Sequence, residues 1–192
     1  MLSTLQEEKL DPRVKRTRSL ILQSFTEILP EKGFHDVSVQ DITDKAGINR
    51  ATFYAHFTDK YQLLDRSIQL LFREEIEKRM LDACHYSDEN LKALIIMVCE
   101  FISNANAHCA PSEPQFESLV ETQAKKQLQE LLQVWLEKEG STVNPKTAAI
   151  AASWAIYGLA LQWSHDKSKK RPSAEKFAEQ VLPLIAPTLK TI

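Results

Sequence analysis

The chain has 192 residues, and its 24 Lys and Arg against 26 Asp and Glu give a formal net charge of −2 at pH 7. This length allows one or two compact domains, and only four glycines among many good helix formers favour helices over sheets. The balanced charge excludes a uniformly basic nucleic-acid binder, so any contact with nucleic acid needs positive charge placed locally.

The first predicted helix begins at Pro12 or Arg13 and ends near Glu31, with Gly33 after it. Proline fits the first turn of a helix because that turn has no intrahelical N–H bond to lose. Four basic residues lie near the start of this helix, namely Arg13, Lys15, Arg16 and Arg18. They could lie beside the DNA backbone, as a flexible arm or as the first turns of the helix. The alternative is that they form a solvated helical face.

Residues 38–60 have the pattern of two short helices joined by a tight turn, with a third helix starting directly afterwards. Ser38 can cap the first of these helices, and Asp41 completes a capping box three residues later. Gly47 ends that helix, because glycine enters the left-handed conformation without steric cost. Asn49 caps the second helix, which is predicted to run to Phe57. The pattern predicts a helix-turn-helix.

One face of this second helix carries basic, hydroxyl-bearing and aromatic residues. Arg50 and Thr52 lie in its first turn, where arginine can donate to guanine and the threonine methyl can contact thymine. The sequence leaves base reading and phosphate contact open for both. Tyr54 and His56 are expected to reach phosphates, which position a protein without specifying sequence. The alternatives are a packed tyrosine ring and a histidine that interacts with the helix dipole.

The sequence AGINRATFYAHFTDK, with Gly33-Phe34 and three further core positions upstream, resembles the DNA-binding domain of TetR/AcrR-type transcriptional regulators over about residues 13–65. The resemblance places Lys60 in the family's phosphate-contact position, at a helix start whose free N–H groups also attract an anion. Beyond residue 65 it covers only the helical architecture. The predicted DNA-binding residues are Ser38, Arg50, Ala51, Thr52, Tyr54, His56 and Lys60.

The next helix is predicted to begin at Thr58 or Asp59 and to continue past Arg73, linking a DNA-binding domain at residues 1–60 to a second domain at residues 61–192. Further helices are expected over residues 91–107, 115–139, 144–163 and 173–182. Pro183 and Pro187 are expected to weaken or end the last one. The predicted fold class is all-α: an N-terminal three-helix helix-turn-helix domain and a C-terminal helical ligand-binding and dimerisation domain.

The resemblance also implies a homodimer, formed by the last two long helices and their copies, and an effector cavity among the central helices. Alanines and Gly158 in segment 146–163 permit close helix approach. Ordinary core packing is the alternative for each cavity residue. The absence of a clear charged cluster favours an apolar or aromatic effector. The candidate ligand-binding residues, chosen for aromatic and methionine content, are Met97, Phe101, Phe116, Trp135 and Tyr157.

Neither a metal, a cofactor nor catalysis is expected. The pairs Cys84-His85 and His108-Cys109 could supply soft ligands, but neighbouring helical residues point apart. Three cysteines without a C-x-x-C pair do not suggest disulfides. The N-terminus has no apolar signal core, and the longest uncharged run, residues 147–165, is short for a bilayer. The prediction is a cytoplasmic protein without a membrane segment.

These observations predict a DNA-binding transcriptional regulator. The predicted form is a dimeric repressor that a small apolar or aromatic effector releases from a palindromic operator in double-stranded DNA. The alternative is a helical interaction protein, or a non-specific DNA-binding protein without an effector. An enzyme is a third possibility, which no motif supports.

Overall fold

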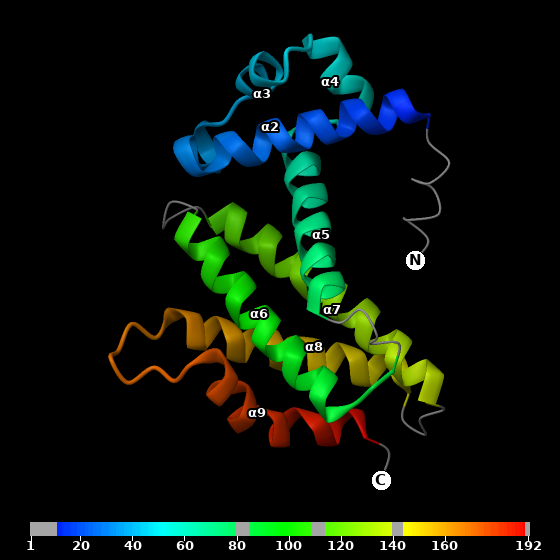
Figure 1. Ribbon diagram of the computed structural model, residues 1–192, viewed down its shortest axis with the longest axis vertical. Helices are drawn as coiled ribbons and strands as arrows, with labels where there is room; N and C mark the ends of the chain where they lie inside the picture. Colours follow the sequence, from blue (N-terminus) through cyan, green and yellow to red (C-terminus); the bar gives the residue numbers. More distant parts are fainter. Residues whose placement is uncertain (1–10, 80–84, 109–113, 140–143, 191–192) are drawn as a thin grey trace. The chain divides into compact units, whose positions relative to one another are not determined.

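The structure is a computed structural model that describes residues 11–79, 85–108, 114–139 and 144–190. It contains no strand in these residues, which confirms the predicted all-α class. The chain divides into two compact units: the first unit includes residues 11–67, and the second unit includes residues 68–107 and 114–190. In chain order the helices are α2 (Pro12–Asp36), α3 (Val39–Ala46), α4 (Arg50–His56), α5 (Lys60–Arg79), α6 (Asp88–His108), α7 (Pro114–Glu139), α8 (Pro145–His165) and α9 (Ala174–Leu189) (Figure 1).

Helix α2 starts at a cap and is broken by a glycine near its end. The Asp11 carboxylate accepts a hydrogen bond from the Arg13 backbone N–H at 2.7 Å, and Pro12 follows the cap. Gly33 has φ 76° and ψ 156°, which interrupts the helix before its last residues. Residues with a Cβ adopt such positive φ values only with strain. The helix end predicted near Glu31 therefore corresponds to this break, while the element itself continues to Asp36.

The helix-turn-helix has the predicted caps. The Asp41 N–H donates to Ser38 Oγ at 3.2 Å, and the Ser38 N–H donates back to the Asp41 carboxylate at 2.9 Å, which completes the capping box. Gly47 ends α3 in the left-handed region at φ 63°, and Asn49 caps α4. Helix α3 packs on both α2 and α4. Each of the three helices contributes fully buried apolar side chains, namely Ile21, Phe25, Ile42 and Phe53.

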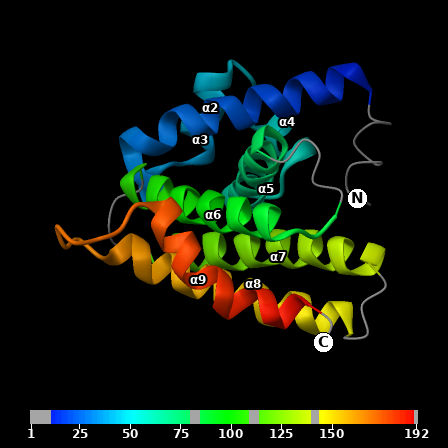
Figure 2. The ribbon, with the colours of Figure 1, turned by 60° about the horizontal axis from the view of Figure 1, so that its bottom comes forward.

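The second unit consists of the later part of α5 and helices α6 to α9. Helix α8 lies along α7, and α9 lies along α8 (Figure 2). Helix α8 buries six residues with small or aliphatic side chains on its inner side, which suits close approach of its neighbours. The centre of the unit is apolar, and Trp135 of α7 is its largest fully buried side chain.

Helix α9 does not end where the sequence predicted. It continues to Leu189, through both Pro183 and Pro187. Each proline removes one backbone hydrogen bond from the helix. The prediction was wrong because the residues beyond Leu182 include Ile185, Ala186 and Leu189, which are buried in the core of the unit and offset those lost bonds.

Candidate nucleic-acid interface

Helix α4 has one buried face and one exposed face. Phe53 is fully buried and Phe57, which caps the C-terminus, is nearly so. Because they are four residues apart, they fix the same side of the helix in the core. Arg50, Ala51 and Tyr54 are exposed, and the Tyr54 side chain is 49% accessible to solvent. The short helix therefore presents its basic and aromatic side chains outward from a rigid base.

Arg50 and Tyr54 contact each other on the exposed face. The Arg50 guanidinium donates a hydrogen bond from Nη2 to the Tyr54 hydroxyl at 3.3 Å and lies 5.9 Å from the centroid of its ring. The contact limits the rotamers of both side chains. A guanidinium has several further N–H donors, so this arrangement can still donate to a base edge or a phosphate.

The hydroxyls of Thr52 and Ser38 take part in the helix caps. Thr52 Oγ1 donates to Asn49 Oδ1 at 2.9 Å, and Ser38 Oγ donates to Asp41 Oδ2 at 2.7 Å. Both side chains thus help to fix the starts of the two helices. Thr52 keeps its methyl group, and each hydroxyl oxygen keeps acceptor capacity.

His56, at the end of α4, lies close to Arg18 of α2. Partial burial, and then the Arg18 charge, lower the pKa of His56. The Arg18 Nε–H is buried and has no hydrogen-bond partner in the described part of the chain. The sequence placed Arg18 only in the basic cluster at residues 13–18. Its position near the end of α4 depends on how α2 packs, which no local pattern encodes.

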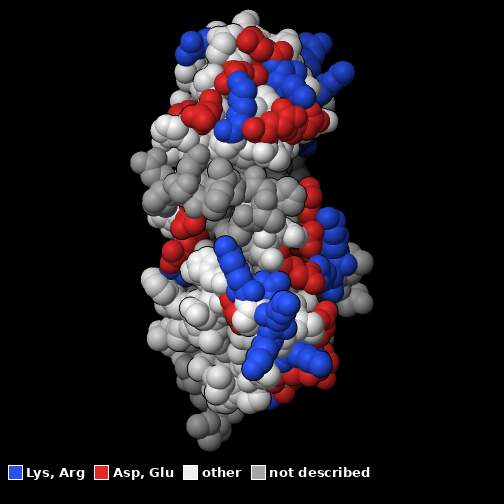
Figure 3. Space-filling model, turned by 90° about the vertical axis from the view of Figure 1, so that its left-hand side faces the viewer, with Lys and Arg blue, Asp and Glu red and all other residues white. Residues whose placement is uncertain are grey.

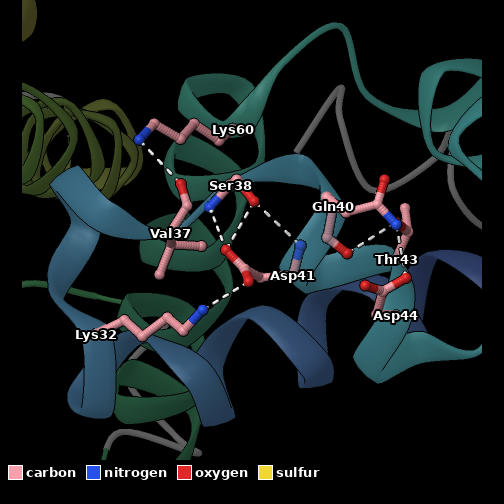
Figure 4. A network of polar contacts seen from close by, with 8 residues as sticks. All are labelled: Lys32, Val37, Ser38, Gln40, Asp41, Thr43, Asp44 and Lys60. Carbon is pink, nitrogen blue, oxygen red and sulfur yellow. Dashed lines mark hydrogen bonds and ion pairs between the residues drawn. The ribbon is translucent and has the colours of Figure 1, made fainter.

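The Lys60 ammonium is bound to the protein backbone. It donates to the carbonyls of Phe34, His35 and Val37 at 2.9, 2.8 and 3.0 Å. It also lies 4.8 Å from the centroid of the Phe34 ring. Figure 4 shows Lys60 facing the segment just before Ser38. Since an ammonium has three donors, these carbonyls occupy all of them. Lys60 thereby ties the first turn of α5 to the end of α2, beyond the break at Gly33.

A second lysine stabilises the start of α3. The Lys32 ammonium lies 2.6 Å from the Asp41 carboxylate (Figure 4). This hydrogen bond, together with those from Ser38, holds the pKa of Asp41 well below its ordinary value. The carboxylate therefore stays charged at the helix N-terminus, where the dipole favours a negative charge.

Two of the five candidate ligand-binding residues line a pocket between α6, α7 and α8. They are Phe116 and Tyr157; the cavity volume is about 70 Å³, and the pocket opens to solvent. Phe101 instead packs edge-on against Phe72, with the ring centroids 5.2 Å apart. Met97 and Trp135 are buried in the core. Three other polar residues of the pocket wall, Glu117, Glu121 and His165, were not among the candidates predicted from the sequence.

The basic segment between α8 and α9, residues 167–171, is an exposed connector. Lys and Arg side chains gather there on the face of the second unit in Figure 3. Trp163 of α8 holds the connector through two contacts. Its Nε1 donates a hydrogen bond to the Pro172 carbonyl at 2.9 Å, and the Arg171 guanidinium lies 4.6 Å from the centroid of its ring.

The described residues contain no group of three or more potential metal ligands. Cys84 and Cys109, which belong to the two pairs considered above, lie outside the described residues. Cys99 is buried, and burial raises the pKa of its thiol to about 12, so it stays protonated. Among the described helices, none combines the length and apolar character needed to cross a membrane.

Comparison with known proteins points to one family. The family described as "Bacterial regulatory proteins, tetR family" matches residues 21–66. The uncharacterised HTH-type transcriptional regulator YxbF of Bacillus subtilis is 40% identical over 73 residues, which are 38% of this chain and 19% of that protein. DhaS of Lactococcus lactis, an HTH-type transcriptional activator of the dhaKLM operon, is 30% identical over 83 residues, covering 38% of this chain and 44% of that protein. The chain thus spans less than half the length of these curated relatives.

The similarity in fold extends over nearly the whole chain. A TetR transcriptional regulator from Streptococcus agalactiae has a solved structure with a TM-score of 0.58. The match is 18% identical in sequence and covers 95% of this chain and 98% of that one. At this identity the likeness concerns the arrangement of helices, whereas the family match falls on residues 21–66, which include α3 and α4.

Proposed function

Because the chain belongs to the TetR family of transcriptional regulators, we propose that it is a dimeric repressor that a small molecule releases from a palindromic operator. The observation that carries the proposal is the exposed face of α4, where Arg50 and Tyr54 extend from a helix held by the buried Phe53. A recognition helix reads the major groove in this way, with its N-terminal residues against base edges. In the cell the protein acts where the chromosome is, in the cytoplasm.

In this proposal the residues of the first unit divide into two kinds of contact. Arg50, Ala51 and Thr52 lie in the first turn of α4 and contact base edges. Ser38, Tyr54 and His56 lie at the borders of the surface and contact phosphates. Lys60 adds a positive charge that attracts the backbone, although its donors are occupied by carbonyls in the unbound protein.

The apolar surface of α8 and α9 supports assembly as a homodimer. Trp154 and Leu184 are 61% and 67% exposed, and Ile150 is also accessible. Gly158 is exposed on the same helix as Trp154, and no heavy atom would lie within 4 Å of a Cβ added to it. Monomeric proteins rarely expose clusters of large apolar side chains to water. A partner helix would remove these side chains from solvent. A dimer also supplies the two recognition helices that a palindromic operator requires.

The switch in this proposal uses α5 and the pocket of the second unit. Helix α5 is continuous from Lys60 to Arg79, and its residues belong to both compact units. A ligand that stabilises one conformation of the second unit changes operator affinity only if the two states bind DNA differently. A coupling of about 1–3 kcal/mol corresponds to a roughly 5–150-fold change in operator affinity.

The test begins with the full-length chain and a pool of randomised DNA duplexes. We expect selection of one palindrome whose half-sites are centred one helical turn, or a multiple of it, apart. Binding that weakens with salt but shows no sequence preference would instead support the alternative, a non-specific DNA-binding protein.

The sign of regulation needs a second measurement, since the relative DhaS is named an activator. Transcription in vitro from a promoter that carries the selected operator should fall when the protein is added. A rise in transcription would leave the DNA-binding assignment intact and replace repression by activation.

A further inference from the structure

The pocket in the second unit has an apolar wall and an acidic one. Helices α6, α7 and α8 provide its apolar side chains, which are Ile102, Phe116, Val120 and Leu161. Its polar residues are Glu117 and Glu121 of α7 and Tyr157 and His165 of α8. The glutamates are four residues apart, so they lie on the same face of α7. Folding thus brings together charged groups that are scattered in the sequence.

One lysine offsets part of this negative charge. The Lys125 ammonium lies 2.6 Å from the Glu121 carboxylate and 3.3 Å from the centroid of the Trp154 ring. It is also 5.9 Å from the Tyr157 ring centroid, but it does not line the pocket. Two carboxylates and one ammonium leave a net charge of −1. Glu117, which is exposed, carries the negative charge that Lys125 does not match.

Tyr157 is a buried polar residue in this wall. Its side chain is only 5% exposed, and no described residue forms a hydrogen bond with its hydroxyl. Burial, and then the charges of Glu121 and Glu117, raise the pKa of Tyr157, and both glutamates line the same pocket as this tyrosine. The phenol therefore stays neutral, and its oxygen can accept a hydrogen bond from a ligand.

We propose that this pocket binds a small amphipathic cation, with an apolar or aromatic body among Ile102, Phe116, Val120 and Leu161 and an ammonium or amidinium group at Glu117, Glu121 and Tyr157. The regulatory consequence rests on the proposed function, because the cation would be the effector that releases the operator. A carboxylate or phosphate in the same place would face two glutamates and be repelled. A neutral ligand would fill the apolar part without the ionic contact.

The test uses three ligands that share a body and differ in charge: 4-phenylbutylamine, 4-phenylbutanol and 4-phenylbutyrate. Binding to the full-length protein is measured by calorimetry at neutral pH, and release of the selected operator is measured in parallel. We expect the amine to bind about threefold to fivefold more tightly than the alcohol, since a partly exposed ion pair contributes up to about fivefold in affinity. The acid should bind most weakly.

Single variants connect the binding to the pocket. Glu117→Gln and Glu121→Gln should each lower the affinity for the amine by about threefold to fivefold and leave the alcohol unchanged. Tyr157→Phe should also weaken the amine selectively. Glu130→Gln is the matched control, because Glu130 is an exposed glutamate of α7 that does not line the pocket. This control should bind all three ligands as the unmodified protein does.

The outcomes separate this inference from the proposed function. Equal or tighter binding of the alcohol or the acid would overturn the cation assignment, whether or not that ligand releases DNA. No binding of any ligand by a protein that still selects its operator would overturn the pocket as a cation site and leave the DNA-binding function in place. Tight, Glu117-dependent binding of the amine without operator release would support the site and contradict release by this effector.

Discussion

Lys60 joins two segments of the first unit through three hydrogen bonds to carbonyls. Replacing it by methionine keeps the apolar stem but leaves those carbonyls without their charged donor. We expect Lys60→Met to lower the free energy of unfolding by about 1.5–3 kcal/mol, measured by urea denaturation. Lys45→Met is the control, because Lys45 forms only an exposed ion pair with Glu27 and should change stability by at most about 1 kcal/mol.

The same variant decides whether Lys60 also contacts DNA. If the ammonium leaves a carbonyl to bind a phosphate in the complex, Lys60→Met should reduce the slope of log affinity against log salt by about one counterion. If the slope stays the same while stability falls, Lys60 positions the helix-turn-helix and is not a phosphate contact.

Arg50 should determine one base position of the operator. We expect Arg50→Ala to cost about 1–3 kcal/mol of operator affinity and to relax the preference at a single base pair. Tyr54→Phe removes the hydroxyl that accepts from Arg50 and should give a smaller loss with the same preference retained. Competition binding with single-base operator variants measures both effects. Uniform weakening across all sequences by Arg50→Ala would assign this residue to a phosphate.

His56 should make the stability of the protein depend on pH. Its pKa is lowered in the folded state by burial and by Arg18, so the unfolded chain binds the proton more readily. The contribution of His56 is therefore fully present above its ordinary pKa of about 6.5 and is lost as the pH falls below it. Between about pH 7.5 and about pH 5.5, His56→Gln should lose less stability than the unmodified protein. An identical loss in both proteins would show that Arg18 and burial do not affect this imidazole.

At the scale of the elements, the turn between α3 and α4 depends on backbone conformation at one residue. Gly47 has φ 63°, and a Cβ added there would have no heavy atom within 4 Å. Any cost of Gly47→Ala is therefore conformational and should be about 1–2 kcal/mol of unfolding free energy. Gly47→Asn should cost less, because asparagine enters the left-handed region more easily.

Urea denaturation of these two variants, with operator affinity measured in parallel, tests the turn. Since the turn sets the angle of α4, affinity should fall in the order glycine, asparagine, alanine. A stable alanine variant with unchanged affinity would mean that the turn tolerates another backbone path.

At the scale of the whole molecule, the exposed apolar residues of α8 and α9 should control assembly. Trp154→Glu places a charge where a partner helix is expected, so we predict a monomer by sedimentation at micromolar concentration and a steep loss of operator affinity. Val134→Glu is the matched control, because it makes a similar change at an exposed apolar residue of α7. A Trp154→Glu variant that stays dimeric would place the dimer interface elsewhere.

Local sequence patterns predicted the features that depend on residues close together in the chain. The capping box at Ser38 and Asp41, the left-handed Gly47 and the cap at Asn49 each need only a few neighbouring residues, and all were predicted where they occur. The same local pattern predicted the match of residues 21–66 to the tetR family and the exposed face of α4. Caps and glycine turns follow from backbone geometry, so a short segment is enough to reveal them.

The packing of the helices brings together residues that are distant in the sequence. It directs the Lys60 ammonium to carbonyls more than twenty residues earlier, and it brings Arg18 beside His56. It buries the part of α9 beyond Pro183, against the helix-breaking tendency of that residue. It also gathers two glutamates, a tyrosine and a histidine around one pocket. These outcomes depend on packing between helices, whose energy comes from burial and contacts that no local pattern of the sequence contains.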